Sequence, residues 1–101
     1  MIKSYSIADA LRLSELYKAF ADETRVKILI SLLTGEKCVG DIANETETSQ
    51  SAVSHQLKML KLSSLVSGKK EGRLVTYALA DDHVRTIINM GLDHIHHTAK
   101  E

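Results

Sequence analysis

The segment from Ala80 to Thr98 constrains the fold more than any other part of the sequence. Its apolar residues recur at the i, i+3, i+4, i+7 spacing of a single helix face. These residues are Val84, Ile87, Ile88, Gly91, Leu92 and Ile95. The pattern predicts a long amphipathic helix whose apolar face packs against another surface.

Four of the five histidines lie in this helix. At 100° per residue, His83, His94 and His97 return to one side of the helix, beside its apolar face. His96 points elsewhere, and we expect it to be an ordinary surface histidine. Histidines near a C-terminus often have no function, but these are regularly spaced within an amphipathic helix. The spacing therefore favours a metal site.

A single copy of this helix is too long to close such a site. His83 and His94 are about 16.5 Å apart along the axis, whereas the ligands of one zinc ion lie within about 3.5 Å of each other. Two helices packed antiparallel would bring Asp81 and His83 of one chain to His94 and His97 of the other, twice, about a two-fold axis. The spacing predicts metal sites shared between subunits.

The length of 101 residues and the 44% apolar content predict one small domain, residues 1–101. No apolar run approaches the roughly 18 residues of a membrane span, and the N-terminus lacks the apolar core of a signal peptide. We therefore expect a cytoplasmic protein with no membrane association. The single cysteine, Cys38, excludes a disulfide within one chain.

The charge of the chain is unevenly distributed, although its net value is zero. Residues 48–73 carry five lysines and arginines but one carboxylate, Glu71, and so a net charge of +4. A localised basic region is typical of a DNA-binding face. The competing interpretation is a solvated surface without a partner.

Two helices are predicted before this basic region. The first, from about Ser6 to Phe20, has two apolar rows, enough to pack on both its own core and a partner subunit. Asp22 is placed to cap a second helix that runs to Leu33, and Gly35 is placed to end it. We expect residues 1–21 and 80–98 to form the dimer interface.

Residues 38–62 have the pattern of a helix-turn-helix. A short helix at 38–43 and a polar stretch at 44–48 precede a helix that Ser49 can cap and that runs to about Lys61. The inward residues of that helix are Val53, Leu57 and Leu60. Its outward residues can hydrogen-bond to base edges or phosphates; they are Gln50, Ser51, Ser54, His55, Lys58 and Lys61.

A basic hairpin follows. Residues 65–70 and 74–79 read as strands, and Glu71-Gly72 is predicted to form the two-residue turn between them. Lys69, Lys70 and Arg73 flank this turn. A basic hairpin directly after a helix-turn-helix is the wing of a winged helix, which can contact the DNA backbone or minor groove. The predicted fold is mainly α with a β-hairpin wing, an α+β winged helix-turn-helix that forms a homodimer.

The run S-x-S-x-V-S-x-x-L-K-x-L at 49–60, followed by L-V and E-G-R…Y-x-L, resembles the ArsR/SmtB family of metal-sensing repressors. The resemblance extends from about Leu13 to His97. It implies base or phosphate contacts from Gln50, Ser51, Ser54 and His55, and a wing contact from Arg73. The pattern D-x-H-x10-H-x2-H resembles the zinc-responsive branch, with its site on the C-terminal helix.

A second family site resembles this sequence less well. Cys38 and Asp41 match half of it, but the N-terminal arm contains neither cysteine nor histidine, and Gly40 stands where thiolate sensors have a second cysteine. We expect this site to be non-functional and Cys38 to be a small buried residue. Thr46 and Thr48 stand where leucine is common, and Ser64 replaces the usual glycine; we expect a less tightly packed turn.

The sequence thus predicts a homodimeric repressor that binds an imperfect inverted repeat of operator DNA when metal-free and is released by Zn(II). Imidazole and carboxylate ligands suit zinc, with Co(II) as a chemical substitute. Zinc would fix the two recognition helices at a spacing unsuited to successive major grooves. The resemblance also implies a hydrogen bond from a ligating histidine to a backbone carbonyl near Ser64.

Two other functions are compatible with parts of this pattern. A zinc enzyme is disfavoured, because catalytic sites keep one position open for water and the four predicted ligands would fill every position. A metal-independent winged-helix regulator, with histidines that merely decorate a dimer interface, stays open as the alternative.

Overall fold

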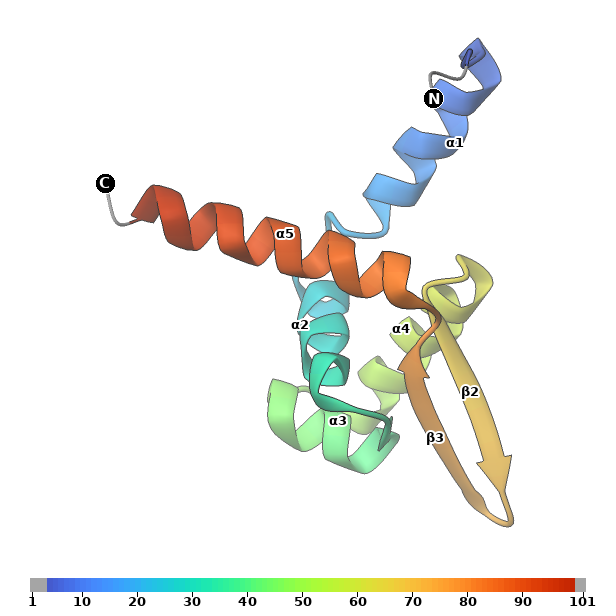
Figure 1. Ribbon diagram of the computed structural model, residues 1–101. Coiled ribbons are helices and arrows are strands. Elements are labelled where there is room, and N and C mark those ends of the chain that lie inside the picture. The colour runs from blue at the N-terminus through green and yellow to red at the C-terminus, as the bar shows by residue number, and fades with distance from the viewer. Residues whose placement is uncertain (1–3, 100–101) are drawn as a thin grey trace.

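The computed structural model describes residues 4–99. They form five α-helices, a 3-10 turn and a three-stranded antiparallel sheet. In chain order these are α1 (Ile7–Lys18), α2 (Glu23–Ser31), η1 (Leu32–Thr34), β1 (Lys37–Cys38), α3 (Val39–Thr46), α4 (Gln50–Leu62), β2 (Val66–Glu71), β3 (Leu74–Leu79) and α5 (Asp82–Ala99). Helices α3 and α4 are the helix-turn-helix, and β2 and β3 project from the body as the wing (Figure 1). The predicted winged helix-turn-helix fold is confirmed.

The core lies between α2, η1, α3 and α4. All of the largest fully buried side chains come from these elements: Ile28, Leu29, Leu32, Ile42, Val53, Leu57 and Leu60. The last three are the predicted inward row of α4, so its opposite face is turned to solvent. The wing is anchored to this core by Leu65 and Val66, which are also buried.

The predicted helix caps are confirmed at two positions. Asp22 accepts a hydrogen bond from the Arg25 amide at 3.0 Å, and Ser49 accepts one from the Ala52 amide at 3.2 Å. The first helix starts one residue later than predicted, because Ser6 is itself a cap, in a reciprocal capping box with Asp9.

The prediction that α2 continues to Leu33 was wrong. The last residues tighten into η1, and Gly35 ends this turn with φ +132°. A 3-10 ending of this kind satisfies carbonyls that an α-helix leaves unpaired.

The sheet differs from the prediction in two details. Strand β1 was not predicted; it pairs with β3, giving the order β1-β3-β2. The wing turn was predicted one residue too early. Glu71 pairs with Leu74, so Gly72 and Arg73 form the turn. The extra pair lengthens the ladder, and Gly72 at φ +63° supplies the left-handed conformation that such a turn needs at its first position. Arg73 therefore lies at the tip of the wing.

The two terminal helices pack unequally on the core. Helix α5 buries Val84 and Ile88. Helix α1 projects away from the body (Figure 1), and none of its twelve residues, all described by the structure, is buried. Ile7 is 91% exposed and Leu11 60% exposed. No helix within residues 4–99 has the length and apolarity to cross a bilayer.

Candidate nucleic-acid interface and metal half-sites

The solvent face of α4 carries the predicted DNA contacts. Their side chains are all exposed: Gln50, Ser51, Ser54, His55 and Lys58. At the start of the helix the hydroxyls of Ser49 and Ser51 lie 3.3 Å apart. The face offers hydroxyl, amide, imidazole and ammonium groups, which can bond to base edges and phosphates.

Polar contacts on the inner side hold α4 in place. Arg25 Nε in α2 donates to Gln56 Oε1 in α4 at 2.7 Å, and both residues are half-buried. The two residues are 31 positions apart in sequence, so the hydrogen bond ties α4 to α2. Because a hydrogen bond is directional, it fixes the rotation of α4 about its own axis more closely than apolar contacts do. Sequence reasoning missed this pair because no local pattern marks it.

The turn of the helix-turn-helix is formed by its polar residues. Helix α3 runs to Thr46, into the stretch predicted to be a loop, because Thr46 is buried and donates its hydroxyl to the Ile42 carbonyl at 2.7 Å. Glu47 then adopts a left-handed conformation with φ 53°. Thr48 donates to the Thr46 carbonyl at 3.1 Å. Both threonines of the turn, Thr46 and Thr48, thus have their hydroxyl groups hydrogen-bonded to backbone carbonyls.

Ser64 ends α4 in the left-handed region, with φ +60°. Its amide bonds to the Lys61 carbonyl at 3.1 Å, and the Leu65 amide bonds to the Leu60 carbonyl at 2.9 Å. This helix ending normally takes glycine, which explains why glycine is the usual residue at this position. Serine is the exception here. The serine is accommodated with backbone strain.

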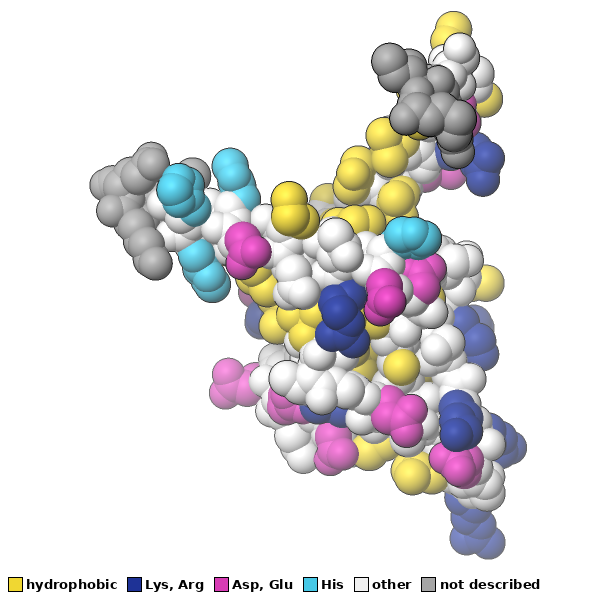
Figure 2. All heavy atoms as spheres, viewed as in Figure 1, with side chains coloured by type: hydrophobic (Ala, Val, Ile, Leu, Met, Phe, Trp, Pro, Cys, Tyr) yellow, Lys and Arg dark blue, Asp and Glu magenta, His cyan; other side chains and the backbone are white. Residues whose placement is uncertain are grey.

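The wing carries the remaining predicted DNA contacts. Lys69, Lys70 and Arg73 are exposed, and lysine and arginine side chains gather around the end of the wing (Figure 2). Lys69 lies 3.8 Å from Glu71 in an exposed ion pair. Such a pair contributes little to stability, so the ammonium group can exchange its carboxylate partner for a phosphate.

The start of α5 brings together two of the predicted metal ligands. Asp81 Oδ1 lies 3.6 Å from His83 Nδ1, and the His83 side chain is 94% exposed. This separation is close to that of two ligands on one tetrahedral zinc ion. Asp81 Oδ1 also accepts a hydrogen bond from the Val84 amide at 3.1 Å. The carboxylate therefore caps α5, which begins at Asp82 and not at Ala80.

The other two predicted ligands lie at the far end of the same helix. His94 and His97 are exposed, and histidine side chains gather at the C-terminal end of α5, away from one near its start (Figure 2). Within residues 4–99 no three histidine, cysteine or acidic side chains converge on one point. The donor groups of each pair suit zinc, but the two pairs lie too far apart along α5 to bind one ion together.

Cys38 is half-buried, whereas the sequence predicted a small buried residue. It lies where β1 meets α3 and pairs across the sheet with Thr76. A Cβ atom added at Gly40 would come to 3.8 Å from the side-chain Nε2 of Gln50, which is an ordinary van der Waals contact. Space therefore does not explain why Gly40 replaces the second cysteine of thiolate sensors.

Two further side chains, Arg85 of α5 and Lys37 of β1, make polar contacts between α5 and the helix-turn-helix. Arg85 Nη1, two residues after His83, donates to the Leu33 carbonyl of η1 at 2.7 Å. Lys37 Nζ donates to Thr34 Oγ1 at 2.6 Å and to the Ser31 carbonyl, and it pairs with Glu45 of α3 at 3.4 Å. A polar path thus runs from α5 through η1 to α3. Sequence reasoning did not single out Arg85 or Lys37.

The sequence matches known regulators over most of its length. Residues 22–67 match the family described as bacterial regulatory protein, arsR family. A cadmium resistance transcriptional regulatory protein CadC homolog of Staphylococcus aureus is 39% identical over 93 residues, which cover 91% of this chain and 77% of that protein. A transcriptional repressor SmtB homolog of Synechocystis sp. is 39% identical over 90 residues, which cover 89% and 68% of the two chains.

Solved structures share the fold. The AntR antimony-specific transcriptional repressor has a TM-score of 0.88 at 27% identity, over 99% of this chain and 91% of that chain. The homodimeric winged helix-turn-helix DNA-binding domain of Mb0332 from Mycobacterium bovis has a TM-score of 0.79 at 28% identity, over 94% and 90%. Together with the fold and the exposed face of α4, these similarities show that the chain belongs to the ArsR/SmtB family of winged helix-turn-helix transcriptional regulators, which are not enzymes.

Proposed function

We propose that this protein is a cytoplasmic homodimeric repressor that binds operator DNA in its metal-free form and releases it when Zn(II) binds at sites shared by the two α5 helices. One observation carries the proposal. Asp81 and His83 lie side by side at one end of α5, while His94 and His97 lie at the other end.

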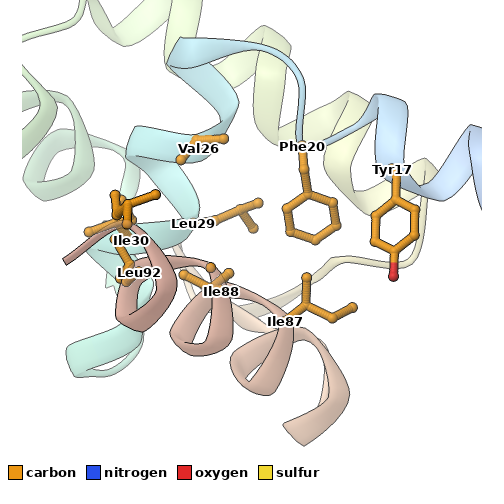
Figure 3. Close-up of a pocket in the computed structure, with 10 residues that line it drawn as sticks. Tyr17, Phe20, Val26, Leu29, Ile30, Ile87, Ile88 and Leu92 are labelled. Carbon is orange, nitrogen blue, oxygen red and sulfur yellow. The ribbon is translucent and has the colours of Figure 1, made fainter. Parts of the chain in front are cut away.

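Dimerisation through α1 and α5 is supported by the apolar surface that one chain leaves uncovered. The end of α1, α2 and α5 enclose an apolar groove of about 320 Å³ (Figure 3). It is lined by Tyr17, Phe20, Val26, Leu29, Ile30, Ile87, Ile88, Gly91, Leu92 and Ile95. An amphipathic helix without buried residues is marginal in water, so α1 gains most of its stability from a partner. The Mycobacterium bovis relative is homodimeric, which supports a homodimer of this chain.

A two-fold dimer explains how the DNA interface is used. Two recognition helices related by two-fold symmetry read half-sites about 34–36 Å apart, one helical turn of DNA, and the operator is then an inverted repeat. In this arrangement Gln50, Ser51, Ser54 and His55 face the bases, while Lys58 and the wing residues Lys69, Lys70 and Arg73 face phosphates.

The donor atoms favour zinc over the metals that prefer sulfur. One similar regulator is named for cadmium resistance and another for antimony. Cadmium and antimony both favour thiolate ligands. Here the four proposed donors are one carboxylate and three imidazoles, and the lone thiol, Cys38, lies apart from them at the β1–α3 junction. Asp81 and His83 of one subunit and His94 and His97 of the other would hold Zn(II), and this binding would cross-link the two helices. Co(II) has similar ligand preferences and can replace it in spectroscopic work.

Contacts within the chain support communication between α5 and the DNA-reading helices. Arg85 holds α5 to the Leu33 carbonyl, and Lys37 joins η1 to Glu45 in α3. A shift of α5 therefore acts on η1 and α3 before it reaches α4. This route differs from the family's implied hydrogen bond to a carbonyl near Ser64, and the two can act together.

The first test is the effect of zinc on DNA binding. On DNA selected from a random library by the metal-free protein, zinc should lower affinity by about 5- to 150-fold, the usual range of allosteric coupling. His83→Ala should bind this DNA normally but should not be released by zinc. If zinc leaves the wild-type affinity unchanged, the proposed release by Zn(II) is wrong.

The roles of the wing and α4 can be separated by salt dependence. Arg73→Ala should weaken binding to every sequence and should flatten the plot of log affinity against log salt by about 2, one phosphate contact for each subunit. Gln50→Ala should cost about 1–3 kcal/mol on the selected DNA and much less on random DNA. Equal losses on both DNAs for Gln50→Ala would remove it from base reading.

Asp81 should have two separable roles. In metal-free protein, Asp81→Ala should lower the free energy of unfolding by about 1 kcal/mol through loss of the α5 cap, whereas Asp81→Asn should preserve the cap. Both substitutions should weaken zinc binding, because both remove the carboxylate. Urea denaturation in the presence of a chelator and competitive zinc titration measure the two effects. Normal zinc affinity in either variant would exclude Asp81 as a ligand.

The sharing of ligands can be tested with mixed dimers. One subunit carries His83→Ala and the other carries both His94→Ala and His97→Ala. In the mixed dimer one site combines all the defects and the other keeps Asp81, His83, His94 and His97. A cobalt titration should count one tight site per mixed dimer and none in either parent homodimer. A count of zero would contradict a site shared between subunits.

A further inference from the structure

Among residues 4–99, no contact explains why residue 91 is a glycine. It lies in the middle of α5 and is exposed. A Cβ atom built there would find no atom of the described residues within 4 Å, apart from the helix's own nearby backbone. Its φ is not in the left-handed range. Glycine in a helix interior lowers the helix equilibrium constant by about fivefold relative to alanine, so another requirement must favour it.

The surroundings of Gly91 indicate a second helix. Gly91 follows Ile87 by four residues and precedes His94 by three, so these residues lie in one row along α5. Gly91 and Ile87 both line the apolar groove between α1, α2 and α5, where Figure 3 shows Ile87 beside Tyr17 and Phe20. The row thus runs between the two proposed metal half-sites. It is apolar in this middle part, and at Gly91 it has no side chain.

The register of the proposed dimer places a specific side chain at this gap. If His83 meets the partner's His94 and His97, the two-fold axis crosses α5 between residues 88 and 90, half-way between the half-sites. A two-fold axis at residue 89, inside this range, pairs residue 91 with residue 87 of the partner subunit. We propose that Gly91 is a notch in the dimer interface that receives the partner's Ile87, and that it sets the separation of the two α5 helices at which the metal ligands meet. This inference rests on the proposed homodimer.

The requirement for a notch follows from distances. Packed helices lie 8–10 Å apart, depending on the side chains at the contact, and residues without side chains give the shortest separations. Zinc tolerates little variation, since its nitrogen and oxygen ligands bind at about 2.0–2.2 Å. By two-fold symmetry each dimer contains two notches and two inserted isoleucines. A side chain at residue 91 therefore separates the helices twice.

Substitutions at Gly91 test the notch. Gly91→Ala favours the helix itself, so any loss of dimer cannot come from a weaker helix. It should raise the dimer dissociation constant by about 10-fold or more, through overpacking at two contacts. Gly91→Leu should raise it more than 100-fold and abolish the tight cobalt sites. Asn89→Leu is the matched control, because it adds leucine to an exposed position about 160° away on the same helix; it should stay within threefold of the wild type.

Sedimentation equilibrium gives the dissociation constants, and circular dichroism checks that each variant is folded. If Gly91→Leu dimerises and binds cobalt like the wild type, the notch is wrong while the homodimer stands. If the wild type is monomeric at micromolar concentration, the proposed homodimer fails, and the notch fails with it.

A double-mutant cycle identifies the inserted side chain. Ile87→Ala alone should weaken the dimer, because it removes apolar contact. In the Gly91→Ala background the same change should strengthen the dimer, because a smaller side chain fits the filled notch. Such a change of sign is direct evidence of contact. Additive effects of the two substitutions would overturn the assignment of Ile87 to the notch.

Discussion

The burial of one face of α4 against α2 and α3 is the interaction on which the rest of the structure depends. Val53, Leu57 and Leu60 are at most 1% exposed, and their burial turns the polar face of α4 outward in one orientation. The Arg25–Gln56 hydrogen bond fixes that orientation further. The other elements are attached to this three-helix core: the wing by Leu65 and Val66, and α5 by Val84 and Ile88. A stable core thus carries two surfaces that face partners.

Those two surfaces differ in how complete they are within one chain. The DNA-facing surface of α4 and the wing is assembled by one chain, and a second copy adds a second half-site. The proposed metal site on α5 is incomplete within one chain, because its donors lie at opposite ends of a rigid helix. Rigidity is useful here, since a bound ion cannot draw the two ends of one helix together. In the proposed function, regulation by metal therefore depends on assembly, and the contacts of Arg85 and Lys37 connect α5 with the helix-turn-helix.

Sequence patterns could predict the parts of the fold that arise from local physics. The periodicity of α4 and α5 identified their inward faces, and Asp22 and Ser49 were recognisable as caps. Strand β1 was not predictable, because two residues are too few to show alternation. The wing turn shifted by one residue because cross-strand pairing of Glu71 with Leu74 decided it.

In the candidate site, too, the local features could be predicted from the sequence and the contacts between distant residues could not. The rise per residue of a helix was enough to predict that the Asp81–His83 pair and the His94–His97 pair lie at opposite ends of α5. The second role of Asp81 as a cap depended on where α5 begins, which periodicity defines poorly. The contacts of Arg25 with Gln56 and of Arg85 with Leu33 join residues 31 and 52 positions apart. Such contacts depend on the folded arrangement of helices, and one sequence contains no local signal for them.

The exposed position of α1 has a consequence for the lifetime of the protein in a cell. A subunit without a partner presents twelve residues of marginally stable helix, and frayed terminal segments are preferred sites of proteolysis. In the proposed dimer the same residues are covered. Newly made subunits would then survive only when another subunit captures them before a protease does. Proteolysis would remove excess monomers and leave dimers intact. The concentration of dimer in the cell would then vary less than the rate at which the chain is synthesised.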